Sequence, residues 1–161
     1  MSTLNEELQE IDEDTQKGKY LTFTLDKEVY AIEIQYVTEI VGIQPITEMP
    51  ELPSHVKGII NLRGGIITVI DMRLRFRKQP AEYDDRTCVI VVKVHDIPIG
   101  LIVDHVTEVL TIADDYIVPP PDIYNNSSCN NLKGIGKVGS EIKLILDCDR
   151  LFKTEDIDLL N

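Results

Sequence analysis

A short phrase occurs twice in this sequence, as VTEI at positions 37–40 and as VTEV at positions 106–109. At a spacing of 69 residues, YAIEIQYVTEIV from Tyr30 aligns with IGLIVDHVTEVL from Ile99. A second block aligns at a spacing of 76 residues, where GIINLRGGIITVIDMRLRF from Gly58 lies over GIGKVGSEIKLILDCDRLF from Gly134. Two blocks in the same order indicate a tandem duplication. Because two copies are too few for a solenoid, the repeat predicts two similar subdomains packed together.

Each copy has the residue pattern of β-strands. YLTFTLD, from Tyr20, alternates large apolar residues with threonine, which is the two-residue period of a half-buried strand. Short polar turns at 26–27 and 95–96 predict an opening hairpin in each copy. About five short strands in roughly 65 residues favour a small closed barrel. The expected fold is all-β, with two tandem five-stranded β-barrel subdomains over residues 19–78 and 86–152 and the linker QPAEYDD between them.

Two further features of the repeat have structural interpretations. The VTE segments fit a bend that leads into a third strand, because their apolar residues suit both one helical turn and a strand. Asp71 and Asp147 each precede a short apolar stretch, and aspartate is a preferred helix N-cap that contributes roughly 0.5 to 2 kcal/mol. Cys88 and Cys148 alternate in register with apolar neighbours, so we expect both thiols to fill the core.

Charge and cysteine content limit the setting of the protein. Sixteen basic and 28 acidic residues give a net charge of −12, which repels phosphate backbones and disfavours nucleic acid as a partner. No stretch approaches the ~20 apolar residues of a membrane-spanning helix, and the acidic N-terminus does not resemble a signal peptide. Three cysteines without a CxxC motif predict neither a disulfide framework nor a zinc site. We therefore expect a cytoplasmic protein without direct membrane insertion.

Catalytic motifs are missing from the sequence. His55, His95 and His105 show no zinc-binding spacing, and no serine lies in a GxSxG motif. GIGKVGS lacks the lysine and hydroxyl residue of a phosphate-binding loop. The sequence therefore predicts no enzyme, no cofactor and no metal. A small hydrolase that pairs Asp71 or Asp147 with a histidine is an alternative from another functional class.

An apolar surplus and one arginine indicate an interaction module instead. IITVI and CVIVV are nearly continuous apolar runs, so their second face is expected to pack on the sister barrel or on a partner. Arg63 lies in NLRGG, between two apolar strands, where its planar head would be presented beside hydrophobic surface. A solvated turn arginine is the alternative that the pattern leaves open.

These motifs resemble the CheW family of bacterial chemotaxis coupling proteins. The resemblance covers residues 19–152 and is carried by VKGIINLRGGIITVIDMRLRF together with the two VTE segments. It implies SH3-like β-barrels and a non-enzymatic scaffold that links the chemotaxis histidine kinase to the cytoplasmic tips of chemoreceptors. It also implies that a barrel of the kinase regulatory domain docks end to end on one barrel. The receptor's helical hairpin would lie in the groove between the two subdomains, within membrane-associated arrays.

The resemblance also assigns candidate partner-binding residues. Arg63 and Gly64 belong to the NLRG motif, and the motif arginine is linked to receptor and array function. Val37 and Glu39 match positions implicated in the receptor contact. The remaining candidates are Gly58, which matches a glycine whose loss disturbs binding, and Val106 and Val109, which are expected to line the same groove.

Two segments and one alternative function complete the expectations. Residues 1–18 are expected to form a flexible acidic arm, and residues 153–161 a C-terminal tail. The alternative within the same family is the adaptor half of a receiver-bearing coupling protein. It is disfavoured because about nine residues follow the match, which is too few for a receiver domain.

Overall fold

Strands dominate the computed structural model, which describes residue 5 and residues 17–120 and 131–152. The strands are β1 (Lys19–Leu25), β2 (Glu28–Glu33), β3 (Val37–Gly42), β4 (Val56–Leu62), β5 (Gly65–Asp71), β6 (Cys88–Val94), β7 (Ile97–Val103), β8 (His105–Thr111), β9 (Ile117–Val118), β10 (Leu132–Val138) and β11 (Glu141–Leu146). Short helical turns are η2 (Ile34–Tyr36), α2 (Met72–Arg75), η3 (Asp114–Tyr116) and α3 (Cys148–Leu151). The all-β prediction is confirmed.

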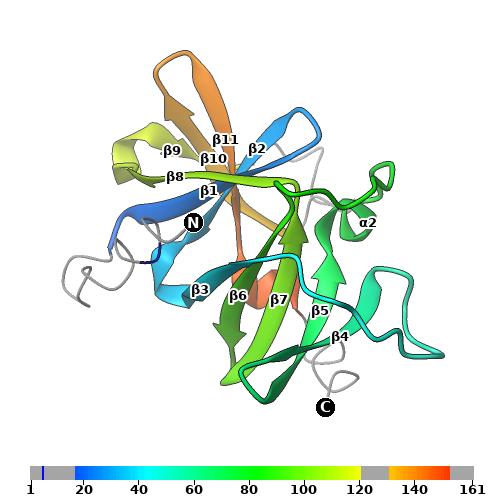
Figure 1. The fold of residues 1–161 in the computed structure, drawn as a ribbon. Coiled ribbons are helices and arrows are strands. Elements are labelled where there is room, and N and C mark those ends of the chain that lie inside the picture. The colour runs from blue at the N-terminus through cyan, green and yellow to red at the C-terminus, as the bar shows by residue number, and fades with distance from the viewer. Residues whose placement is uncertain (1–4, 6–16, 121–130, 153–161) are drawn as a thin grey trace.

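Two sheets hold these strands, and each sheet mixes the two sequence copies. The six-stranded sheet has the order β8-β1-β2-β11-β10-β9, and the five-stranded sheet has the order β3-β6-β7-β5-β4. In Figure 1 the blue opening hairpin β1–β2 accordingly lies with the orange strands β10 and β11, while the green hairpin β6–β7 lies beside β3 and β5. The two copies have therefore exchanged their opening hairpins.

This exchange corrects the predicted subdomain boundaries of 19–78 and 86–152. Residues of both ranges contribute to both sheets, so neither barrel is a continuous segment of the chain. The physical reason lies in the connections: the chain leaves the six-stranded sheet through η2 after β2, and it returns at Asp104 after β7. Alternating residues predict a strand and its hairpin neighbour, but they do not determine the distant partner across a parallel pair.

The internal duplication is visible in the strand pairing. Thr68 of β5 pairs in parallel with Ile99 of β7, and the equivalent Leu144 of β11 pairs in parallel with Tyr30 of β2. The antiparallel pairs β4–β5 and β10–β11 also share a register shift at equivalent places, before Gly58 and before Gly134. The repeat found in the sequence therefore corresponds to two sheets with the same internal order.

One large apolar cluster lies between the sheets, and each sheet has a smaller cluster of its own. The shared core takes residues from both sheets, including Phe23, Ile32, Ile40, Ile90, Leu101, Leu146 and Phe152. In CVIVV the side chains alternate, since Cys88, Ile90 and Val92 belong to the shared core and Val89 and Val91 to the core of the five-stranded sheet. Full burial of each such aliphatic side chain contributes roughly 1.5–3 kcal/mol. The second apolar face of this strand thus packs on the sister barrel, as predicted.

The hairpin turns also follow the sequence. The predicted turns at 26–27 and 95–96 join β1 to β2 and β6 to β7, with positive φ at Asp26, His95 and Asp96. Each predicted VTE strand is present, and the first follows the bend formed by η2. Most of the predicted N-terminal arm, the C-terminal tail and the third cysteine, Cys129, lie outside the described residues.

Candidate partner-binding site

Arg63 lies in the turn that joins β4 to β5, where its backbone adopts a positive φ of 51°. Gly64 follows with a φ of 83°, and its N–H donates a 3.0 Å hydrogen bond to Asn61 Oδ1. Two successive positive φ values are typical of a tight hairpin turn whose twist matches the flanking strands. The turn presents the Arg63 side chain, which is 69% exposed, at the end of the five-stranded sheet.

The guanidinium of Arg63 pairs with Glu39. Arg63 Nη2 donates a hydrogen bond to Glu39 Oε2, and this contact also forms an ion pair. Glu39 belongs to β3 and Arg63 follows β4, which are the two edge strands of the five-stranded sheet. A contact between opposite edges shows that this sheet curls on itself, as a barrel does. Of the predicted candidates, the structure therefore brings Arg63, Gly64 and Glu39 to one surface.

Val37 begins the same strand as Glu39. It is half-buried and packs against the shared core, so part of its side chain borders the region between the sheets. Val109, on β8 of the other sheet, is also half-buried and also packs against the shared core. These two valines thus pack against the shared core from different sheets.

Val106 differs from its neighbour Val109. It pairs with Phe23 of β1 and is only 4% exposed. The expectation that Val106 lines a binding groove is corrected on this point, because a partner cannot contact a side chain that is already covered by the shared core. Its burial contributes to stability instead.

Gly58 has a structural explanation that the sequence did not reveal. Its φ is 149°, and a Cβ at this position would lie 2.1 Å from the carbonyl oxygen of Thr47. The equivalent Gly134 is similarly crowded, since its Cβ would lie 3.0 Å from the carbonyl oxygen of Val118. Both glycines therefore permit a neighbouring segment to lie close beside the strand, at Thr47 for β4 and at β9 for β10. Gly58 is buried, so replacing it changes packing before it changes any contact with a partner.

Two exposed isoleucines were missed by the sequence analysis. Ile66 is 70% exposed near the start of β5, and Ile142 is 60% exposed near the start of β11. The prediction that both faces of IITVI are covered is therefore wrong at Ile66, because the strand extends past the core at its hairpin end. Their equivalence in the repeat was the available signal, since both copies place isoleucine at the same point after the turn.

Both repeat aspartates cap short helices. Asp71 Oδ1 accepts a 3.2 Å hydrogen bond from the N–H of Leu74, and its Oδ2 accepts a 2.7 Å bond from the Tyr83 hydroxyl. Asp147 Oδ1 accepts bonds of 3.0 Å and 3.2 Å from the N–H groups of Asp149 and Arg150. The N-cap prediction is confirmed at both positions. These carboxylates are occupied by structural hydrogen bonds, which removes the basis of the hydrolase alternative.

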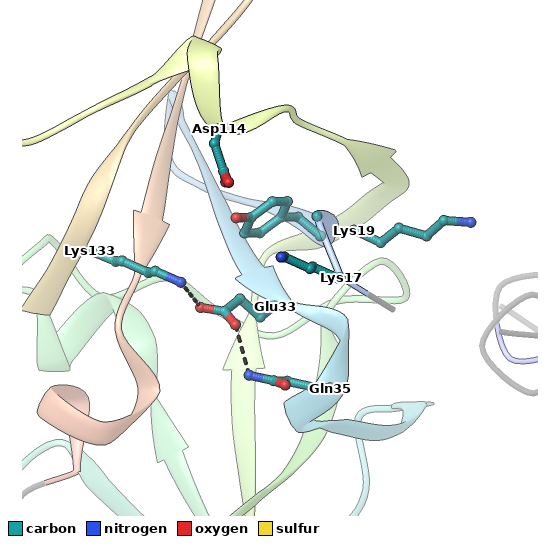
Figure 2. Close-up of a pocket in the computed structure, with 8 residues that line it drawn as sticks. Lys17, Lys19, Glu33, Gln35, Asp114 and Lys133 are labelled. Carbon is teal, nitrogen blue, oxygen red and sulfur yellow. Dashed lines mark hydrogen bonds and ion pairs between the residues drawn. The ribbon is translucent and has the colours of Figure 1, made fainter. Parts of the chain in front are cut away.

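A polar cavity of about 660 Å³ lies beside the end of β2. Figure 2 shows Lys133 reaching Glu33, with a 2.5 Å hydrogen bond, and Gln35 donating a 2.8 Å bond to the same carboxylate. The bond to Glu33 raises the pKa of the Lys133 ammonium. The lining contains Lys17, Lys19 and Asp114 but no histidine and neither capping aspartate. This cavity therefore does not bring together the aspartate and histidine that the hydrolase alternative requires.

The remaining chemistry is structural in the described part of the chain. Cys88 and Cys148 are buried thiols, as predicted, and burial raises the pKa of both. Across residues 17–120 and 131–152, no group of three or more His, Cys, Asp or Glu is placed to hold a metal ion. In the same ranges, no helix has the length and apolarity needed to span a membrane.

Comparison with known proteins agrees with the geometry. A family model described as a CheW-like domain matches residues 19–156. The chain is 34% identical over 143 residues to the chemotaxis protein CheW of Klebsiella aerogenes, covering 89% of this chain and 86% of that protein. It is 29% identical over 137 residues to the chemotaxis protein CheW of Bacillus subtilis, covering 85% and 88%. The crystal structure of the scaffolding protein TtCheW from Thermoanaerobacter tengcongensis matches with a TM-score of 0.78 and 35% identity, covering 86% of this chain and 94% of that chain.

Proposed function

This chain belongs to the CheW-like family, and we propose that it couples a chemotaxis histidine kinase to the cytoplasmic tips of chemoreceptors. Proteins of this family are non-enzymatic adaptors, and the two capping aspartates and the ion-paired Glu33 are consistent with a chain that turns over no substrate. The relatives are named as chemotaxis and scaffolding proteins. The adaptor would act where receptors cluster at the cytoplasmic face of the membrane.

The receptor surface is proposed to centre on Arg63 and Glu39. The single observation that supports it best is their contact, which joins an exposed arginine to an edge strand beside the shared core. Because Glu39 holds one side of the guanidinium, its remaining N–H groups stay directed outward for acceptors on a receptor helix. Val37 and Val109 supply apolar surface at the junction of the sheets. A helical hairpin laid along this junction would meet both kinds of contact.

The kinase surface is proposed to lie at a hairpin end. Ile66 and Ile142 are exposed large apolar side chains at equivalent ends of the two sheets. Apolar anchors at a protein surface are typical of docking sites, and an end-to-end contact between barrels needs such an anchor. Ile142 belongs to the other sheet, so a kinase contact there would leave the Arg63 surface free for the receptor, whereas Ile66 follows Arg63 by three residues and adjoins that surface.

The test is a titration of the purified chain with a receptor-tip fragment and, separately, with the kinase regulatory domain. We compare wild type with Arg63→Ala and with the matched control Arg77→Ala, since Arg77 is also exposed and also has a positive φ, of 59°. The proposal requires that both partners bind wild type and that only Arg63→Ala weakens the receptor. Equal loss in both variants would point to general electrostatics, and absence of binding by folded wild type would refute the adaptor role.

A further inference from the structure

The backbone of Ile40 is bound on its open side by the side chain of Asn5. The Ile40 N–H donates a 3.0 Å hydrogen bond to Asn5 Oδ1, and Asn5 Nδ2 donates a 3.0 Å bond to the Ile40 carbonyl oxygen. Both polar groups of one residue are thus satisfied by one carboxamide. This is the pattern that a neighbouring strand would make with its own backbone.

The position of β3 explains why these groups are available. β3 is an edge strand of the five-stranded sheet, with β6 on one side only. The N–H and C=O of one strand residue point to the same side, so the groups of Ile40 that Asn5 binds face away from β6. Unpaired backbone groups on an edge strand form a ready template for another chain. The outward edge at Ile40 is therefore an interaction surface.

The chemistry of this surface favours a carboxamide. Asparagine and glutamine carry a donor and an acceptor at the spacing of a peptide group, whereas an ionised aspartate offers acceptors alone. Gln44 uses only the donor half of its carboxamide nearby, since its Nε2 donates a 3.1 Å bond to the Gly42 carbonyl oxygen. The equivalent of Ile40 in the other sheet is Val109, and in the described ranges no side chain is bonded to its backbone in this way.

The location links this edge to the proposed receptor surface. Ile40 directly follows Glu39, which holds Arg63, and both residues belong to β3. Asn5 lies 35 residues from Ile40 in sequence, so the contact is long-range. A ligand that bonds the same Ile40 groups would have to displace Asn5.

We propose that Asn5 occupies the outward edge of β3 in the free protein and competes there with a carboxamide side chain on the receptor helix, whose own backbone groups are bonded within the helix. The identity of the competitor rests on the proposed function. The contact between Asn5 and Ile40 is independent of that function. When a site is partly occupied from within, the apparent affinity of an external ligand equals its intrinsic affinity multiplied by the fraction of molecules that are open. Release of Asn5 would therefore raise receptor affinity without altering the kinase surface.

The experiment uses the full chain and the substitutions Asn5→Ala and Asn5→Asp, with Gln44→Ala as the matched control at the same edge. Hydrogen exchange of the Ile40 amide, followed by NMR, measures the contact directly. Loss of a hydrogen bond is expected to speed this exchange about tenfold in Asn5→Ala. Asn5→Asp should retain protection of the N–H better than Asn5→Ala, because its carboxylate still accepts that bond. Gln44→Ala should leave the Ile40 amide unchanged.

The second measurement is affinity for the receptor-tip fragment and for the kinase regulatory domain. We expect receptor affinity to rise about twofold or more in Asn5→Ala, with kinase affinity unchanged. Unchanged exchange at Ile40 would overturn the contact, and faster exchange without tighter receptor binding would overturn the competition. If wild type and variant both fail to bind receptor, the proposed function fails, while the exchange result still decides whether Asn5 holds the edge.

Discussion

Thr47 and Ile59 exchange two backbone hydrogen bonds of 2.9 Å, and this bridge brings the Thr47 carbonyl against Gly58. The equivalent contact in the other sheet is made by a short strand, since Val118 of β9 pairs with Ile135 of β10. In both sheets a segment pairs antiparallel with the strand that follows it in sequence and passes close to a glycine of that strand. This pairing is therefore part of the duplicated unit, although it was not visible in the sequence alignment.

Gly58→Ala should destabilise the fold by at least about 2 kcal/mol, because the added Cβ meets a backbone oxygen and the residue already has a positive φ. Gly64→Ala is the matched control, since its φ is 83° and a Cβ there would meet no atom within 4 Å. It should cost about 1 kcal/mol from backbone strain alone. Urea denaturation measures both. Equal stability losses in the two variants would show that the Thr47 segment moves away from the added Cβ at little cost.

Asp104 should make the free energy of unfolding depend on pH in the acid range. Its carboxylate accepts bonds of 2.8 Å and 2.5 Å from Arg73, and it accepts a 2.8 Å bond from the N–H of Asp26. Burial opposes its ionisation, but these bonds outweigh burial and hold the pKa of Asp104 below its ordinary value of 3.8. The contribution of Asp104 to the stability of the fold is therefore fully present at pH values above its ordinary pKa. It is lost as pH falls through the lower pKa that Asp104 has in the folded protein.

Asp104→Asn removes this dependence. At neutral pH the variant should lose about 1 to 3 kcal/mol, because Arg73 keeps only part of its hydrogen bonding and loses its counter-charge. Below pH ~3 the difference from wild type should shrink. Denaturant titrations at neutral and acid pH provide the check. A stability difference that stays constant with pH would contradict the assigned role of the Asp104 charge.

The fold was predictable where local chemistry decides it. Alternation gave the opening strands, and the helix starts at Asp71 and Asp147 followed from N-cap preference, as the hydrogen bonds to Leu74 and Arg150 confirm. The pairing of β2 with β11 was not predictable, because a parallel neighbour depends on where the chain crosses between the sheets. The hairpin exchange followed from that crossing.

The candidate site was predictable in part. The position of Arg63 in a turn followed from the glycines after it, but its pairing with Glu39 depends on barrel closure, which brings the two edges of one sheet together. Val106 and Val109 look alike in sequence, yet Val106 is buried and Val109 is partly exposed. Alternation along β8 places the two side chains on opposite faces of the strand, but it does not say which face is turned toward the core.

Tyr83 should contribute to stability from within the predicted linker. Its hydroxyl donates to Asp71 Oδ2, and burial together with Asp71 raises the pKa of this phenol. Tyr83→Phe should therefore destabilise the protein by about 1 kcal/mol, since one carboxylate oxygen loses its donor in a partly buried place. The same substitution at Tyr116, which is 60% exposed, is the control and should have little effect. Thermal denaturation at pH 7 measures both, and equal shifts would argue against the Asp71 contact.

Ile66→Asp and Ile142→Asp should distinguish the two hairpin ends. Neither substitution should lower stability by much, because both side chains are mostly exposed. A charge in an apolar docking contact leaves a desolvated group without a partner, so the end that meets the kinase should lose about tenfold or more in affinity for its regulatory domain. Receptor affinity should stay at the wild-type level in Ile142→Asp, because Ile142 belongs to the other sheet, whereas Ile66 adjoins Arg63 at the same hairpin end. Full kinase binding by both variants and by the double substitution would exclude the hairpin ends.

The final prediction concerns how Glu39 acts on Arg63. If Glu39 serves to orient the guanidinium, Glu39→Ala should weaken receptor binding in wild type but have no further effect in an Arg63→Ala background. Stability should change little in any of the three variants, because Arg63 is exposed and exposed ion pairs contribute little. Isothermal titration with the receptor-tip fragment completes this double-mutant cycle. Additive losses would instead mean that Glu39 contacts the receptor independently, and the surface would then consist of two separate charges on opposite edges of one barrel.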